Sequence, residues 1–192
     1  IDLHTAAIDR ANLPQIRADL GNERLEQMAM VFGAPVAVNA ALREGSLRAC
    51  AAERDIPVLG YEAGEALRVD ELSIRAGVRG VLNVMRAMEM LPPLKKAPSN
   101  RQTVIAKTTR WVRAPSSGVV ITMASLGSRV QEGDKLALIC DPLGDSEEKV
   151  LAPFEGIVIG ASRKPVAHEG DALFHLADFR SIGKAENLVE EF

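Results

Sequence analysis

Two polar side chains in the first third of the chain, His4 and Glu62, follow short apolar runs and could carry hydrolytic chemistry. The run at residues 1–4 is typical of the end of a buried strand, where a neutral imidazole can bind zinc and Asp2 or a carbonyl can fix its tautomer. The run at residues 57–62 ends in a carboxylate, the group that takes a proton from water in general base catalysis. Taken singly, each pattern also fits a hydrogen-bonded histidine and an ordinary surface glutamate.

Three short motifs, in their order along the chain, resemble the succinylglutamate desuccinylase/aspartoacylase family of zinc-dependent deacylases, which is related to the zinc carboxypeptidases. The resemblance implies that His4 is the third zinc ligand and that Glu62 is the general acid/base. It also implies that the other two ligands, a His and a Glu three residues apart, lie upstream of Ile1. We therefore expect a missing N-terminal segment, one zinc ion in the complete protein, and absent or weak zinc binding by this chain. The motifs are Asp2-Leu3-His4-Thr5, Asn12-Leu13-Pro14-Gln15-Ile16-Arg17 and Tyr61-Glu62-Ala63-Gly64-Glu65.

Several arginines near these motifs could bind the carboxylates of an N-acyl amino acid, because a guanidinium binds a carboxylate through two parallel hydrogen bonds. Arg10 and Arg17 are the cations close to the stretch after His4, which we expect to be a loop through Pro14. Arg48 and Arg54 precede Glu62, where related enzymes place an arginine, and the spacing does not choose between them. We take Arg17, Arg48 and Arg54 as candidate substrate-binding residues, although solvated surface arginines give the same pattern.

The elements that must position these residues alternate short apolar strands with helices. This alternation indicates an α/β layer sheet, in which ligands gather at strand ends. Together with the family resemblance it predicts a partial zinc-peptidase-like α/β/α layer domain over residues 1–94. Helices are expected at 22–32 (capped by Asn22 and ended by Gly33), at 46–53 (capped by Ser46) and at 69–91, and strands at the start of the chain, at 34–40 and at 57–62.

The second half has short β-rich runs in an internal repeat, in which Ala114-Pro115 recurs as Ala152-Pro153 and each half supplies a strand, a loop, a Gly-Asp turn and another strand. The repeat resembles the barrel-sandwich hybrid of biotinyl and lipoyl domains, and the same module occurs at the C-terminus of deacylases of this family. We therefore expect a small all-β domain at 103–178, a linker at 95–102 and an acidic tail at 179–192.

A carrier domain with a modified lysine is a competing interpretation of the β half. The connection between the two repeats, at residues 140–149, holds Pro142, Leu143 and Gly144 at its tip and no lysine there, which argues against a carrier. His168 and His175 lack ligand spacing to His4, so we leave both out of the metal site.

Composition excludes several classes of function. With 192 residues, 47% hydrophobic and 26% charged, and a net charge of −3, the chain is typical of globular proteins and has no basic face for nucleic acid. No apolar run approaches the ~18 residues that a membrane helix needs, so no membrane partner is expected. Cys50 and Cys140 lack metal spacing and are expected to be reduced thiols, which favours a cytoplasmic protein.

The sequence thus favours a zinc-dependent hydrolase, a deacylase that cleaves the amide bond of an N-acyl amino acid or a related small acylated amine. Its partner would be that small-molecule substrate. A non-catalytic binding module, or a metal-free fragment of such an enzyme, is the alternative, and a peptidase acting on a C-terminal residue would share the metal chemistry. The acyl group, the amine and a homo-oligomeric state stay open. The hydrolase hypothesis requires His4 and Glu62 to share one cleft.

Overall fold

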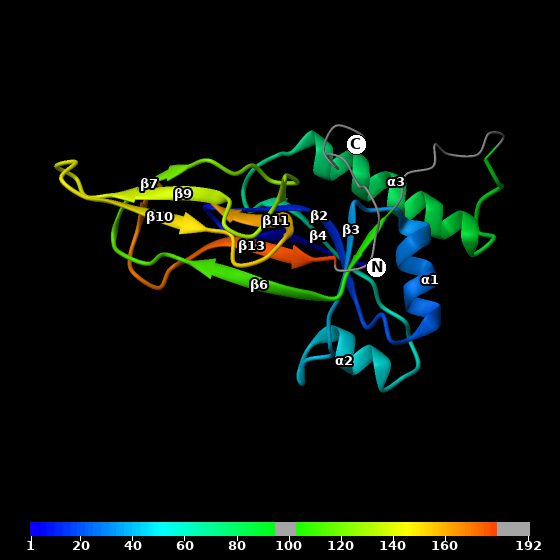
Figure 1. The fold of residues 1–192 in the computed structure, drawn as a ribbon. Coiled ribbons are helices and arrows are strands. Elements are labelled where there is room, and N and C mark those ends of the chain that lie inside the picture. The colour runs from blue at the N-terminus through cyan, green and yellow to red at the C-terminus, as the bar shows by residue number, and fades with distance from the viewer. Residues whose placement is uncertain (95–102, 180–192) are drawn as a thin grey trace.

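The structure is a computed structural model that describes residues 1–94 and 103–179. Figure 1 shows helices α1 and α3 side by side at one end of the molecule and a group of strands that extends away from them. In chain order the first half contains β1 (Asp2–Ala6), β2 (Arg10–Ala18), α1 (Glu23–Phe32), β3 (Val36–Asn39), α2 (Leu47–Ala52), β4 (Gly60–Glu65) and α3 (Glu71–Ala87). The second half contains β5 (Val104–Ala106), β6 (Thr108–Arg113), β7 (Gly118–Thr122), β8 (Arg129–Val130), β9 (Lys135–Cys140), β10 (Glu147–Leu151), β11 (Gly156–Ser162), β12 (Val166–Ala167) and β13 (Ala172–Asp178).

The predicted order, an α/β half followed by a β-rich half, is confirmed. Nine strands form one sheet in the order β1-β4-β2-β11-β13-β6, with β3 and β5 continuing from β2 and β8 pairing with β11. The other four form a second sheet in the order β10-β9-β7-β12. In the β half the two sheets share an apolar core that includes Val130, Leu136, Ile139, Val150, Val158, Phe174 and Leu176.

The nine-stranded sheet joins the two halves of the chain, because β2 pairs with β4 on one side and with β11 on the other. The expected linker at 95–102 and residues 180–192 of the expected tail lie outside the described residues. Among the residues that are described, no helix is long and apolar enough to cross a membrane.

Helices α1 and α2 begin where the sequence predicts, and α3 begins at Glu71, two residues after the predicted start. Asn22 accepts hydrogen bonds from the backbone N–H groups of Arg24 and Leu25, and Gly33 ends α1 in the left-handed region at φ 75°. The Ser46 side chain caps α2 in the same way. Asp70 caps α3, which ends at Ala87, four residues before the predicted boundary. These caps satisfy N–H groups that lack a partner within the helix.

Helix α3 packs closely against α1 and against β4 of the sheet, through two glycines. A Cβ placed on Gly80 would lie 2.2 Å from Cε1 of Phe32, and one on Gly77 would lie 2.9 Å from Cε1 of Tyr61. The Tyr61 hydroxyl donates a hydrogen bond of 2.6 Å to the carbonyl oxygen of Ser73 on α3. Burial raises the pKa of Tyr61, with nearby Asp70 as a smaller cause, so its hydroxyl stays a donor. This contact fixes α3 against β4, the strand that carries Glu62.

Residues 10–14 are part of strand β2, not the loop that the sequence predicts. The register with β4 pairs Asn12 with Gly64 and Gln15 with Glu62, so Leu13 and Pro14 lie opposite a single residue. This arrangement is a β-bulge, where a residue is left out of the hydrogen-bond ladder. Proline, which has no N–H to donate, is tolerated at such a position, so it does not end the strand.

His4 and Glu62 lie within their strands, not at the strand ends that the sequence predicts. Strand β1 is also not a buried strand: it lies at the edge of the sheet with β4 as its partner, and Leu3 is 63% exposed. Strand β4 continues past Glu62 because it pairs on both sides, Glu65 with Ala6 of β1 and Gly64 with Asn12 of β2.

Candidate active site

The register of the sheet places His4 and Glu62 directly side by side. His4 of β1 is the parallel partner of Glu62 on β4, and Gln15 of β2 is the antiparallel partner of the same glutamate. Paired residues on neighbouring strands project to the same face of a sheet, so the three side chains share one face. Tyr61, the neighbour of Glu62, belongs to the opposite face and packs with the cores of α1 and α3. The polar site therefore lies on the face that these helices leave uncovered.

The His4 imidazole has one nitrogen engaged and one nitrogen available. Its Nε2 lies 2.7 Å from Oδ2 of Asp2, and 55% of the His4 side chain is exposed. When Nε2 carries the proton and donates to this carboxylate, Nδ1 keeps its lone pair. Nδ1 has no hydrogen-bond partner among the described residues. The contact with Asp2 thus favours a tautomer in which Nδ1 is available to a metal ion.

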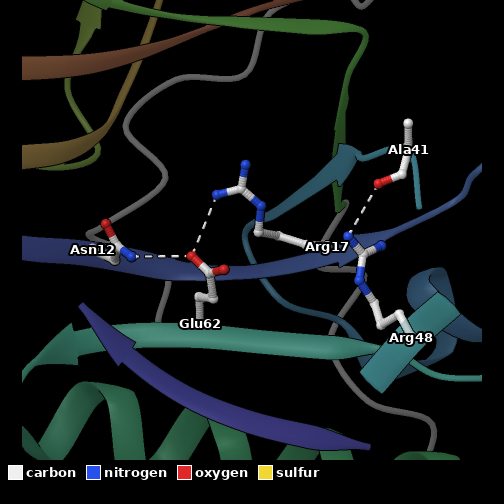
Figure 2. Close-up of polar contacts among 5 residues, drawn as sticks. All are labelled: Asn12, Arg17, Ala41, Arg48 and Glu62. Carbon is white, nitrogen blue, oxygen red and sulfur yellow. Dashed lines mark hydrogen bonds and ion pairs between the residues drawn. The ribbon is translucent and has the colours of Figure 1, made fainter. Parts of the chain in front are cut away.

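The Glu62 carboxylate is held through one oxygen. Figure 2 shows the Asn12 amide and the Arg17 guanidinium converging on it from strand β2. Nδ2 of Asn12 donates to Oε2 of Glu62 at 3.2 Å, and Nη1 of Arg17 donates to the same oxygen at 3.3 Å. Oε1 makes no hydrogen bond within the described part of the chain. The side chains of Arg17 and Glu62 are 24% and 27% exposed, so the free oxygen can be reached by a small molecule.

The three candidate substrate arginines occupy different places. Arg17 is the one that contacts Glu62. Arg48 on α2 donates to the carbonyl oxygens of Ala40 and Ala41, and Figure 2 shows it beyond Arg17 and pointing toward Ala41. Arg54 donates to the carbonyl oxygen of Cys50, and 62% of its side chain is exposed. Arg17 is therefore the candidate that lies at Glu62, whereas Arg48 and Arg54 donate to backbone carbonyl groups in and near α2.

Sequence reasoning missed three further polar or aromatic residues on this side of the sheet. His175 on β13 is 4% exposed and stacks on Trp111 of β6, with ring centroids 4.5 Å apart and an angle of 7° between the planes. Gln15 is fully buried, and neither its amide nitrogen nor its amide oxygen has a hydrogen-bond partner among the described residues. No local pattern marks these positions, because their neighbours come from strands distant in the sequence.

Acid should destabilise the fold through His175. Burial, and secondarily Arg17 and Arg10, lower the pKa of His175 from 6.5 to about 4. Between those two values the unfolded chain binds more protons than the folded chain, so stability falls as the pH is lowered through this window. We expect this residue alone to reduce the free energy of unfolding by about 2 kcal/mol between pH 7 and pH 5.

Urea unfolding at pH 7 and pH 5 measures this effect. His175→Phe should remove about 2 kcal/mol of the pH dependence. The same comparison with His168→Gln, which changes an exposed histidine, should leave the dependence as in the wild type. Equal pH dependence in wild type and His175→Phe would mean that the imidazole titrates normally in the folded chain.

The described residues supply an incomplete donor set for zinc. They contain no group of three or more His, Cys, Asp or Glu side chains that could hold a metal ion. A catalytic zinc is held by about three protein ligands, and Nδ1 of His4 fits as one of them. Any zinc at this position therefore needs donors beyond those that the described chain supplies.

Comparison with known proteins gives a consistent structural likeness. No protein-family model and no curated protein sequence matches the chain. Among solved structures, a succinylglutamate desuccinylase/aspartoacylase from Rhodobacter sphaeroides is 25% identical to this chain, with a TM-score of 0.79. The superposed region covers 93% of this chain and 57% of that protein. The apo structure of the ectoine utilization protein EutE (DoeB) from Ruegeria pomeroyi is 20% identical, with a TM-score of 0.78. Here the superposed region covers 92% of this chain and 58% of that protein.

A third solved structure, an aspartoacylase family protein from Mesorhizobium loti, is 17% identical with a TM-score of 0.73 and covers 92% of this chain and 61% of its own. The chain thus spans somewhat more than half the length of these neighbours. The likeness runs through both the α/β half and the β half, which confirms the resemblance inferred from the motifs. Over nearly its whole length, the chain has the fold of the corresponding part of the succinylglutamate desuccinylase/aspartoacylase proteins.

Proposed function

We propose that the complete protein is a hydrolase of the deacylase type, which cleaves the amide bond of an N-acyl amino acid or a related small acylated amine. The observation that carries this proposal is the pairing of His4 with Glu62 on the open face of the sheet, with Nδ1 of one and Oε1 of the other both unengaged among the described residues. The names of the structural neighbours, which include desuccinylase and aspartoacylase, support the same class of reaction.

Glu62 is suited to act as the general base and then the general acid. Asn12 and Arg17 donate to Oε2 and so orient the carboxylate, while Oε1 can take a proton from water. The water oxygen adds to the acyl carbon, the carbon–nitrogen bond breaks, and the same proton passes from Glu62 to the leaving nitrogen. The products are a carboxylic acid and an amine, with no other reactant needed.

We further propose that the complete protein holds one zinc ion, with His4 as one ligand and the remaining donors outside the described residues. Zinc at this position would supply a positive charge that polarises the acyl carbonyl. The role of this chain would be to orient His4 through its contact with Asp2 and to place Glu62 beside it.

Metal removal tests this proposal. Treating the complete protein with a chelator should abolish release of amine from N-acyl amino acids, and added zinc should restore it. His4→Gln should lower both the zinc content and the turnover, whereas His168→Gln, at an exposed position in the β half, should change neither. Full activity in protein shown to be free of metal would contradict the zinc proposal. Saturable binding of acylated amino acids without any turnover in the zinc-loaded protein would favour the non-catalytic module instead.

A further inference from the structure

Gln15 on β2 is a buried glutamine whose side-chain amide is unengaged. The residue is fully buried, and within the described part of the chain neither Nε2 nor Oε1 has a hydrogen-bond partner. The same part of the chain has one more buried side-chain atom without a hydrogen bond, Oε2 of Glu65, and this atom lies 3.3 Å from Nη1 of Arg163 in an ion pair. A buried amide with both ends unpaired costs folding free energy, so its presence beside a candidate site calls for a functional explanation.

The register of the sheet gives this amide two polar neighbours. Glu62 of β4 lies directly opposite Gln15, whereas the partner on β3 is Val36, an apolar and fully buried residue. Along β2, Arg17 shares a face with Gln15, because alternate residues of a strand point to the same side. The side-chain groups that the register brings to the amide are therefore the Glu62 carboxylate and the Arg17 guanidinium.

The Glu62 carboxylate lies over the position of Gln15 and is only loosely held. Asn12 and Arg17, which precede and follow Gln15 on this face, both donate to its Oε2 (Figure 2). These contacts, at 3.2 and 3.3 Å, are longer than the about 2.7–2.9 Å of a strong charge-assisted hydrogen bond. Opposed Cβ atoms in an antiparallel pair are about 4.5–5.5 Å apart, so a change of side-chain torsions can bring the amide to the carboxylate.

We propose that Gln15 is a positioning residue for Glu62, and that in the zinc-loaded site its amide bridges Arg17 and Glu62. The proposal rests on the proposed function. Nε2 of Gln15 donates to the Glu62 carboxylate, and Oε1 of Gln15 accepts from an N–H of Arg17, a side chain with five donors. Both unpaired atoms of the amide then have partners. The carboxylate gains a further support from β2 while its proton moves, and Gln15 itself touches neither substrate nor zinc.

Gln15→Met in the complete protein should lower kcat about tenfold, the effect of losing one well-placed hydrogen bond, and should change KM less than about twofold. Methionine is unbranched and apolar and supplies no N–H donor. Initial rates over a range of N-acyl amino acid concentrations measure both constants. Gln27→Met is the matched control, because the exposed Gln27 amide donates to Glu23 at 3.1 Å outside the site, and both constants should stay as in the wild type. Wild-type kcat in Gln15→Met would overturn the proposal.

Urea unfolding of metal-free samples separates positioning from structural support. Because the amide has no partner among the described residues, an apolar side chain in its place should keep or raise the urea midpoint. A residue that only supports the fold would lose stability and kcat together. A lowered midpoint in Gln15→Met would therefore refute the positioning role.

Combining Gln15→Met with Glu62→Gln tests whether Gln15 acts through Glu62. If it does, the second substitution should lower the residual turnover of Glu62→Gln by less than about twofold, because the effects of coupled residues are not additive. The same tenfold loss in both backgrounds would show that Gln15 acts independently of the glutamate and would contradict the proposal.

A crystal structure of the zinc-loaded complete protein needs no turnover, so it distinguishes this inference from the proposed reaction. We expect Nε2 of Gln15 within hydrogen-bond distance of the Glu62 carboxylate. That contact in a protein that hydrolyses no acylated amine would retain the role of Gln15 in holding Glu62 and refute the deacylase. An amide still unbonded to Glu62 in a zinc-loaded protein that does hydrolyse acylated amines would retain the deacylase and refute the role of Gln15.

Discussion

Glu62→Gln in the complete protein is expected to lower turnover about 10²–10⁴-fold, the range that a positioned general base contributes. The amide has nearly the same shape as the carboxylate, and its oxygen can still accept from Asn12 and Arg17. It cannot take up a proton at neutral pH. We therefore expect the loss in kcat, with little change in KM or in zinc content.

Initial rates with a panel of N-acyl amino acids, together with metal analysis of the same samples, measure this effect. Glu155→Gln is the matched control, because Glu155 is an exposed carboxylate paired with Arg129 outside the site, and its turnover should stay close to that of the wild type. Wild-type turnover in Glu62→Gln would remove this residue from the mechanism.

Gly80→Ala is expected to lower the free energy of unfolding by about 2–3 kcal/mol, although alanine is the better helix former by about 1 kcal/mol. The added methyl would lie between 2.2 and 2.4 Å from three carbon atoms of the Phe32 ring. Phe32 is fully buried and packs against Tyr61, with ring centroids 5.1 Å apart, so it has little room to move. The strain would fall on the packing of α3 against α1.

Urea unfolding of three variants tests this packing. Gly77→Ala should cost less than Gly80→Ala, because its methyl meets only the edge of Tyr61 at 2.9 Å. Adding Phe32→Leu to Gly80→Ala should recover part of the loss by making room. A Gly80→Ala protein as stable as the wild type would show that α1 and α3 do not pack as described.

Local features of the fold could be predicted from the sequence. Asn22 and Ser46 were identifiable at the starts of their helices because a cap depends on residues within one turn. Pro14 misled the prediction, because its tolerance depends on a bulge that only the pairing with β4 creates. A residue that breaks structure in isolation is accommodated here by long-range strand pairing.

The candidate site was only partly predictable for the same reason. The family resemblance singled out His4 and Glu62, but their register, side by side within β1 and β4, depends on strands that are distant in the sequence. His175 could not be placed, because its position follows from the pairing of β11 with strands of both halves. Its neighbours in sequence, Phe174 and Leu176, indicate a strand and nothing about which polar groups lie across it.

Anomalous X-ray diffraction at the zinc absorption edge, from crystals of the complete protein grown with zinc, tests the central claim most directly. We predict one strong peak about 2.0–2.1 Å from Nδ1 of His4. The peak should lie on the sheet face that carries Asn12, Arg17 and Glu62, with the Glu62 carboxylate turned toward it. A peak only at another position, such as His168 in the β half, or no peak beside His4 in zinc-loaded crystals, would contradict a hydrolytic site built on this pair.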